Sequence, residues 1–114
     1  MEKRGRYLDF RMFEGPESPE VEEEWNRFYN TEHAPVVVKY RSGVIRAYRY
    51  VAVEREEGAP KYITIYEMET SDAMSREKST EGYEKALHTP WYKKMLPHFR
   101  RTGHGVYRQI YPEE

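Results

Sequence analysis

The chain has 114 residues and a formal net charge of −1, which is enough length for one domain, and we place that domain at residues 1–114. Only 19 residues are Leu, Ile, Val or Phe, a fraction that alone suggests disorder, but 11 Tyr and 2 Trp supply ring area for a core. The chain has no Cys, no apolar run long enough to span a membrane, no apolar leader segment, and a pI near 6.4. These features exclude disulfide and thiolate chemistry and argue against a membrane or nucleic-acid partner, so we expect a cytoplasmic protein.

The first predicted elements are a strand and an amphipathic helix. Residues 7–13 alternate in the way that predicts a strand with Arg11 on one face and its neighbours on the other. Ser18 followed by Pro is typical of a helix start. We expect this helix to end at His33, because Pro35 disfavours helical geometry at the residue before it and begins a short separate turn.

The rest of the chain predicts three further strands and three short helices. The strands are expected at 44–53, 62–68 and 106–111. The helices are expected after a cap at Ser71 and Asp72, at about 80–88 and at 91–96. Gly103 and Gly105 are expected to precede the last strand. The order β-α-β-β-α-β predicts an α+β, ferredoxin-like fold, a four-stranded antiparallel sheet with helices on one face.

Large side chains occupy both faces of the predicted strands. Ile63 and Ile65 alternate with Tyr62 and Tyr66 along the third strand, for example. The face away from the helices therefore needs a cover, and a second copy of the chain is the simplest one. We predict a homodimer that buries its open sheet faces.

Trp25, Tyr29 and His33 recur every four residues, so they share one edge of the first helix. A helix C-terminus favours a protonated imidazole. An imidazole in that place, beside Trp and Tyr, is a candidate general acid or base near neutral pH. The alternative is a histidine that caps the helix or packs in the core, bonded to a backbone carbonyl.

This segment also carries a family resemblance. The pattern WxxxYxxxHxP at 25–35, the strand KYITIYEME, the stretch HTPWYKKMLPHFR and the closing VYRQIYP resemble the EthD-like branch of the dimeric α+β barrel superfamily, over nearly the whole chain. The resemblance implies a dimer with a small-molecule cleft between helices and sheet in each subunit. It implies that His33 is the functional histidine and that Trp25 and Tyr29 are the helix aromatics of the site. Relatives in the superfamily include muconolactone isomerases, polyketide cyclases, cofactor-free monooxygenases and haem-degrading enzymes.

Other residues are weaker candidates for substrate binding. In the superfamily the segment before the last strand walls the pocket, which implies lining roles for His88 and Trp91; the alternatives are a surface histidine and a core tryptophan. Arg11 and His98 complete the predicted substrate-binding residues. The acidic run at 14–24 and the basic run at 93–108 are interpreted as solvated surface or, for the basic run, as a rim that attracts an anion such as a substrate carboxylate.

Strand tyrosines offer hydroxyls that could donate to a carbonyl or enolate oxygen, and Tyr66 is our first choice. The four histidines form no i, i+4 pair and no HxH motif, so we expect no metal site and no cofactor. His88 is the only fair axial ligand for a haem.

The sequence therefore predicts a cofactor-independent enzyme of the isomerase, cyclase or lyase type, acting on a small, partly apolar carbonyl or aromatic compound. His33 would move a proton, Tyr66 or Tyr29 would hold an oxygen, and Trp25 with Trp91 would enclose the ring. The alternatives are a non-catalytic binding or accessory dimer and, with less support, a haem-degrading enzyme or cofactor-free monooxygenase.

Overall fold

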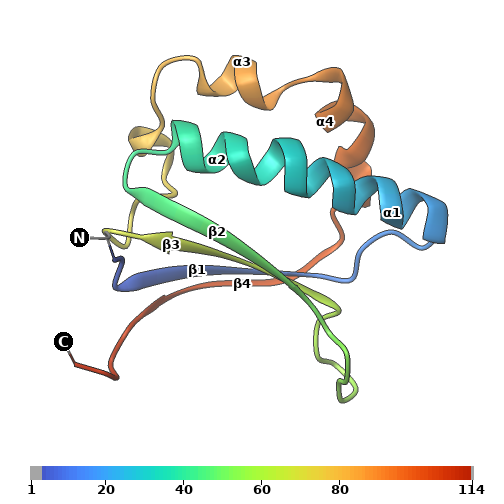
Figure 1. Cartoon of the computed structure of the whole chain (residues 1–114), viewed down its shortest axis with the longest axis horizontal. Helices are drawn as coiled ribbons and strands as arrows, with labels where there is room; N and C mark the ends of the chain where they lie inside the picture. Colours follow the sequence, from blue (N-terminus) through green and yellow to red (C-terminus); the bar gives the residue numbers. More distant parts are fainter. Residues whose placement is uncertain (1–3, 114) are drawn as a thin grey trace.

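The computed structural model describes residues 4–113 and shows four strands beneath a layer of helices (Figure 1). The strands are β1 (Tyr7–Phe13), β2 (Val44–Val51), β3 (Tyr62–Met68) and β4 (Arg101–Arg108). They form one antiparallel sheet in the order β2-β3-β1-β4. The predicted α+β, ferredoxin-like fold is therefore confirmed.

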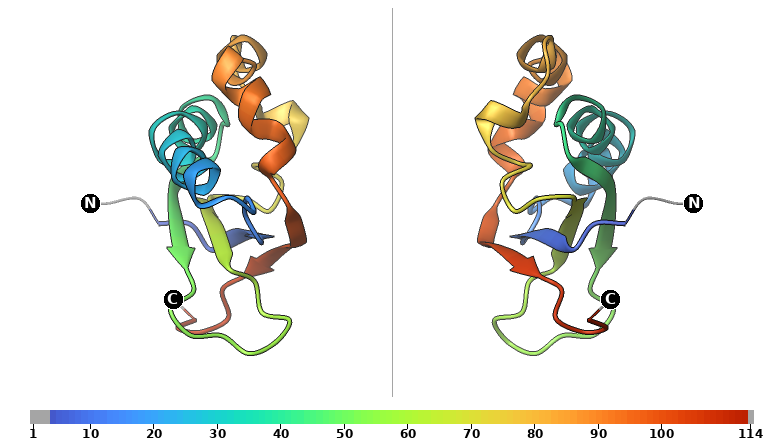
Figure 2. Two further views of the ribbon diagram at one scale, coloured as in Figure 1. Left: turned by 90° about the vertical axis from the view of Figure 1, so that its right-hand side faces the viewer. Right: turned by 90° about the vertical axis from the view of Figure 1, so that its left-hand side faces the viewer.

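The helices all lie on one face of this sheet, as the two end-on views of Figure 2 show. They are α1 (Pro19–Phe28), α2 (Ala34–Tyr40), α3 (Tyr83–Leu87) and α4 (Pro90–Met95), with 3₁₀ turns at Arg76–Lys78 and Leu96–His98. In Figure 2, α1 with α2 forms one arm over the sheet, and α3 with α4 forms a second arm beside it. None of the helices within residues 4–113 has the length and apolar character needed to cross a membrane.

Two helix starts follow the predicted capping pattern. The Ser18 side chain accepts a hydrogen bond from the Val21 N–H, and the Thr89 side chain accepts one from the Tyr92 N–H. In each case a proline follows the capping residue, where its missing N–H costs no helical hydrogen bond. These caps fix where α1 and α4 begin.

The predicted end of the first helix at His33 is wrong. Residues Tyr29–His33 form a π-helical turn, in which the Ala34 N–H donates to the Tyr29 carbonyl, and the helix then continues as α2 to Tyr40. Pro35 has no N–H to donate and its ring crowds the carbonyl one turn back. The wider π turn makes room for that ring, so Pro35 changes the hydrogen-bonding pattern of the helix without ending it.

The strand β4 begins earlier than predicted and contains the two glycines that are expected to precede it. Gly105 pairs with Phe10 of β1, and a Cβ on Gly105 would lie 2.8 Å from the ring of Tyr107. The Tyr107 ring therefore lies across the glycine, where it meets Phe10 edge to face at 5.2 Å between ring centroids. Gly105 is part of the sheet because it leaves space for this ring, which restores the missing side-chain packing. The strand β2 also ends two residues before its predicted end, at Val51.

The alternation along β3 separates the core from the open face of the sheet. Tyr62, Thr64 and Tyr66 are buried under the helices, whereas Ile63 and Ile65 point the other way and are only partly covered. The open face also carries other large apolar side chains, namely Leu8, Phe10, Met12, Tyr48, Tyr50 and Tyr107. The helix-facing side holds the cavity described next.

Candidate functional site

A cavity of about 290 Å³ lies between the two helical arms and the sheet. Its floor comes from β1, β3 and β4, and its walls come from the helix that runs through α1 and α2 and from the segment containing α3 and α4. Two exposed residues, Leu96 and Arg101, belong to its lining, so the cavity reaches solvent beside them. Its polar lining includes Arg11, Tyr29, His33, Arg41, Tyr66 and Arg101.

His33 lies in this cavity within a group of aromatic rings. Its ring centroid is 5.0 Å from that of Tyr29, 5.2 Å from that of Phe99 and 5.7 Å from that of Tyr92, which stacks on the imidazole at 18°. These contacts fix the orientation of the imidazole. Nδ1 is buried and has no hydrogen-bond partner within residues 4–113. No hydrogen bond joins the imidazole to the backbone of residues 4–113.

Burial, together with the positive charges of Arg11 and Arg49, lowers the pKa of His33 to about 4. The imidazole is therefore neutral near pH 7, which corrects the expectation that a helix C-terminus keeps it protonated. The physical reason is that the helix continues past His33 into α2, so the free carbonyl groups of a helix end are absent at this position. A neutral imidazole acts as a proton acceptor.

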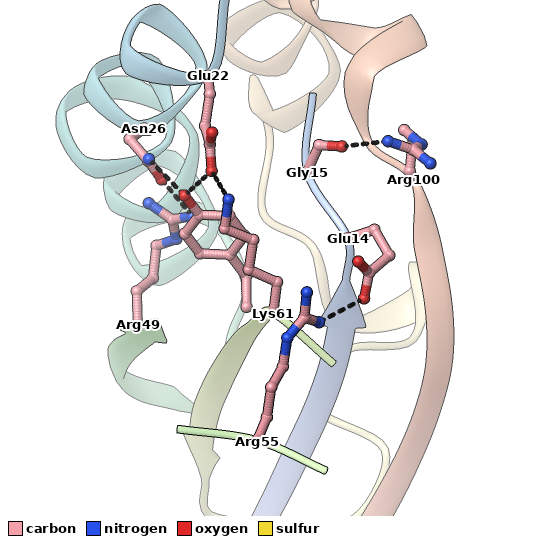
Figure 3. A network of polar contacts seen from close by, with 9 residues as sticks. Glu14, Gly15, Glu22, Asn26, Arg49, Arg55, Lys61 and Arg100 are labelled. Carbon is pink, nitrogen blue, oxygen red and sulfur yellow. Dashed lines mark hydrogen bonds and ion pairs between the residues drawn. The ribbon is translucent and has the colours of Figure 1, made fainter. Parts of the chain in front are cut away.

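Arg49 is a fixed cation beside the site. Its guanidinium carbon lies 4.1 Å from the centre of the Tyr29 ring, and its terminal nitrogens donate to the side-chain oxygens of Asn26 and Asn30, each at 2.9 Å (Figure 3 shows Asn26). A stacked and doubly hydrogen-bonded guanidinium keeps one geometry. The charge that acts on His33 is therefore held in place by the first helix.

Tyr62 belongs to the same network, and its hydroxyl is hydrogen-bonded there. Its hydroxyl donates to Glu22 and accepts from the Asn26 amide at 3.0 Å, while Lys61 pairs with Glu22 at 2.7 Å (Figure 3). Tyr62 does not line the cavity. Tyr48 and Tyr50 lie on the open face, so Tyr66 is the strand tyrosine that reaches the site.

Tyr29 and Tyr66 form a buried pair of phenols, each 1% exposed. Burial raises the pKa of both phenols, that of Tyr66 well above 10. Both groups are therefore neutral hydrogen-bond donors at any physiological pH, as stabilisation of a developing oxyanion requires.

Arg11 lines the same cavity and is oriented from behind by a buried carboxylate. Asp9 is 1% exposed; one of its oxygens accepts from Arg11 Nε at 2.9 Å, and the other lies 2.9 Å from His104 Nε2. This arrangement uses only one nitrogen of the Arg11 side chain. The structure thus brings together the predicted residues His33, Tyr29, Tyr66 and Arg11.

The two predicted tryptophans lie outside the cavity lining. Trp25 is 0% exposed and packs in the core against Phe13 and Phe99. Trp91 packs on Phe28 and donates its indole N–H to Glu24 at 3.1 Å. Both rings support the helices from behind, so we leave them out of the proposed substrate-binding set.

The other two predicted histidines are also elsewhere. His88 is exposed and pairs with Glu84 at 3.1 Å, four residues earlier on the same helical segment. His98 ends the 3₁₀ turn after α4 and does not line the cavity. Within residues 4–113, no group of three or more His, Cys, Asp or Glu side chains is placed to hold a metal ion.

Several cavity residues were not in the predicted site. Tyr92 and Phe99 form part of the wall around His33, and Arg41 lies at the end of α2. The aromatic residues that follow His88 in the sequence indicate such a wall, but their order does not show which ring faces inward. Only the docking angle of α4 decides that Tyr92, rather than its neighbour Trp91, faces the cavity.

The acidic and basic runs of the sequence lie against each other. Lys94 pairs with Glu24 at 2.9 Å, and Arg100 pairs with Glu17 at 3.8 Å and donates to the Gly15 carbonyl at 2.9 Å (Figure 3 shows this last bond). These pairs join the start of α1 to the segment around α4. Of the cations in the basic run, Arg101 lines the cavity.

No family model matches the chain, and no curated protein matches it in sequence. Solved structures do resemble it. HapK from Hahella chejuensis superposes with a TM-score of 0.57 at 7% identity, covering 95% of this chain and 96% of that one. An ethyl tert-butyl ether D (EthD) family protein from Bacillus halodurans superposes with a TM-score of 0.54 at 13% identity, covering 91% of this chain and 98% of that one. A dimeric ferredoxin-like protein from Thermobifida fusca superposes with a TM-score of 0.50 at 8% identity, covering 94% of this chain and 92% of that one.

These similarities extend over nearly the full length of each compared chain, at identities that carry information on fold alone. They agree with the strand order and the one-sided helix layer of the structure. The chain therefore shares the ferredoxin-like α+β fold of these proteins, among them an EthD family protein, as its sequence predicted.

Proposed function

We propose that this protein is a cofactor-independent enzyme of the isomerase, cyclase or lyase type, with His33 as its general base. The observation that supports the proposal most directly is the unbonded, neutral imidazole of His33 in a cavity shared with two phenols. A histidine that serves only for packing or capping is expected to have its ring nitrogens bonded to backbone. A base needs a free nitrogen within reach of a substrate.

The reaction that this arrangement supports is proton transfer at a carbon next to a carbonyl. His33 takes the proton, the C–H electron pair forms a new C=C bond, and the π pair of the carbonyl moves onto its oxygen. The resulting enolate accepts a hydrogen bond from the Tyr29–Tyr66 pair. His33, now an imidazolium, returns its proton to another atom of the same molecule. Protons and electrons therefore balance without an oxidant or reductant, and for this reason we prefer an isomerase, cyclase or lyase.

The His33→Gln variant tests this proposal, because glutamine is polar and of similar size but cannot accept a proton at neutral pH. A panel of small lactones, cyclic ketones and aromatic carbonyl compounds is incubated in D₂O, and deuterium incorporation next to the carbonyl is followed by NMR. We expect the protein to catalyse exchange and the variant to be slower by about 100-fold. His88→Gln is the matched control and should keep full activity, since His88 is exposed and outside the cavity.

Full exchange activity in His33→Gln would show that His33 is not the base. A compound that binds and is recovered without exchange or conversion would instead support the alternative of a non-catalytic binding protein. The axial ligand predicted for a haem, His88, lies outside the cavity and pairs with Glu84.

We also propose that the protein is a homodimer that covers the open sheet faces. That face carries a contiguous set of apolar side chains, with Phe10, Ile65 and Tyr107 near its middle. The similar protein from Thermobifida fusca is described as dimeric. A partner sheet would also hide the exposed ring of Tyr107, which is 54% exposed in the single chain.

Ile65→Glu should convert this dimer to a monomer, because it places a charge in the centre of the apolar interface. Sedimentation equilibrium is expected to show the mass of two chains for the unmodified protein and of one chain for the variant. Val53→Glu makes the same chemical change at a loop residue that is 98% exposed and should leave the mass unchanged. A monomeric unmodified protein, or a dimeric Ile65→Glu variant, would contradict this mode of assembly.

A further inference from the structure

The cavity lining carries positive charge without a lining carboxylate. Arg11, Arg41 and Arg101 belong to it, and no Asp or Glu of residues 4–113 does. Asp9, the counter-ion of Arg11, is fully buried behind that side chain and is also in contact with His104. A space enclosed by apolar walls and lined by cations favours an anionic occupant.

Two of the three arginines have donors to spare. Arg41 is engaged, since it donates to the Ser75 carbonyl at 2.6 Å and lies 4.3 Å over the Tyr83 ring. Arg11 uses Nε alone for its bond to Asp9, so its two terminal nitrogens make no hydrogen bond or ion pair with any residue from 4 to 113. The exposed Arg101 side chain makes no hydrogen bond or ion pair with any residue that the structure describes.

Arg11 and Arg101 are also placed to act on one small molecule. Arg101 pairs with Phe13, which is two residues from Arg11 on the same face of β1. Side chains at such diagonal positions of neighbouring strands are within reach of each other when they are long. Terminal guanidinium nitrogens bind carboxylates as a two-pronged fork, which a lysine cannot do.

The size and walls of the cavity indicate what the rest of the molecule is. A volume of about 290 Å³ is at the small end for ligand sites. Phe13, Phe99 and Tyr92 supply flat apolar surface around it. This combination fits a single ring better than a long chain or a fused polycyclic system.

We propose that the molecule bound in this cavity is a small cyclic organic anion, with one aromatic or enolisable ring and a carboxylate held by Arg11 and Arg101. This inference rests on the proposed function for the reacting end of the molecule and adds the group that anchors it. An anchored carboxylate also offsets the positive charge of Arg11 beside His33. Binding should therefore raise the pKa of His33 from about 4 toward its ordinary range and make it a stronger base in the complex.

Titration with benzoate and with benzamide tests the anchor, because the two probes share a ring and differ in charge. With the full chain at pH 7 and low salt, followed by NMR chemical shifts, benzoate should bind at least about tenfold more tightly than benzamide. Arg11→Gln and Arg101→Gln should each weaken benzoate binding by about tenfold. Arg108→Gln is the matched control on β4, outside this cavity, and should change nothing.

The Arg101→Gln result decides the matter if Arg11→Gln fails to fold, since Arg101 is exposed and has no partner to lose among residues 4–113. Equal affinity for benzoate and benzamide, or unchanged benzoate affinity in Arg101→Gln, would overturn the anchor. His33→Gln separates the two proposals: it should lose proton exchange yet still bind benzoate. Exchange that survives in His33→Gln would overturn the proposed base and leave the anion site standing.

Discussion

Replacing Trp25 with Ala is expected to lower the free energy of unfolding by about 3–5 kcal/mol. Trp25 is 0% exposed and meets the rings of Phe13, Tyr29, Tyr62 and Phe99 edge to face at 5.1–5.9 Å. It joins α1 to the sheet and to the segment after α4, so the space it leaves cannot close without moving all three. Guanidinium unfolding followed by far-ultraviolet circular dichroism at fixed protein concentration measures the loss.

Trp25→Phe is the matched control for this prediction. It keeps a ring in the core, and the indole nitrogen that it removes is buried with no hydrogen-bond partner within residues 4–113. We therefore expect a loss of less than half that of the alanine variant. If Trp25→Ala costs under about 1 kcal/mol, the packing described around α1 is incorrect.

The stability of the protein should fall as the pH drops from about 6.5 to about 4, and His33 is the reason. In the unfolded chain this imidazole takes up a proton near its ordinary pKa of about 6.5, whereas in the folded chain burial, Arg11 and Arg49 lower that pKa to about 4. Between these values the unfolded state binds the extra proton, so acid favours unfolding. The full effect of one group with this shift is about 3 kcal/mol, all of it present above pH 6.5 and lost near pH 4.

The charged groups that face His33 define the control. Arg11 on β1 and Arg49 on β2 both disfavour the imidazolium, and the neighbouring phenols Tyr29 and Tyr92 are uncharged in this range. His33→Gln should therefore remove this part of the pH dependence and leave that of the carboxylates. Unfolding free energies of both proteins, measured from pH 4 to 7.5, should diverge by the stated amount; parallel curves would show that the His33 pKa is not lowered.

The sequence correctly predicted the strands whose side chains alternate between a buried and an open face. The bounds of β1 and β3 are as expected, because residues such as Tyr66 and Ile65 alternate between a covered and an open face. The last strand was misplaced since Gly105 is a turn residue by composition and a strand residue by packing. That packing depends on the Tyr107 ring lying across it, which no local pattern indicates.

For the site, spacing along one helix identified His33 and Tyr29, and strand alternation identified Tyr66. Arg11, which pairs with Asp9, lies on β1, and Arg49 lies on β2; both charges act on His33 only after the chain has folded. The lowered pKa of His33 therefore could not be predicted from the sequence. The inward-facing side of α4 was likewise undetermined. Electrostatics and helix docking angles are properties of the folded chain.

The π turn at Tyr29–His33 has a consequence for chain length. It accommodates one residue more than α-helical bonding would, so it sets the rotational phase between the two halves of one long helix. In a regular α-helix one extra residue rotates everything before it by about 100° relative to everything after it. The wider π turn absorbs this rotation, so Trp25 and His33 both face inward. A single inserted residue, kept in place by Pro35, is what lets one helix fill the core at its start and present a base to the cavity at its middle.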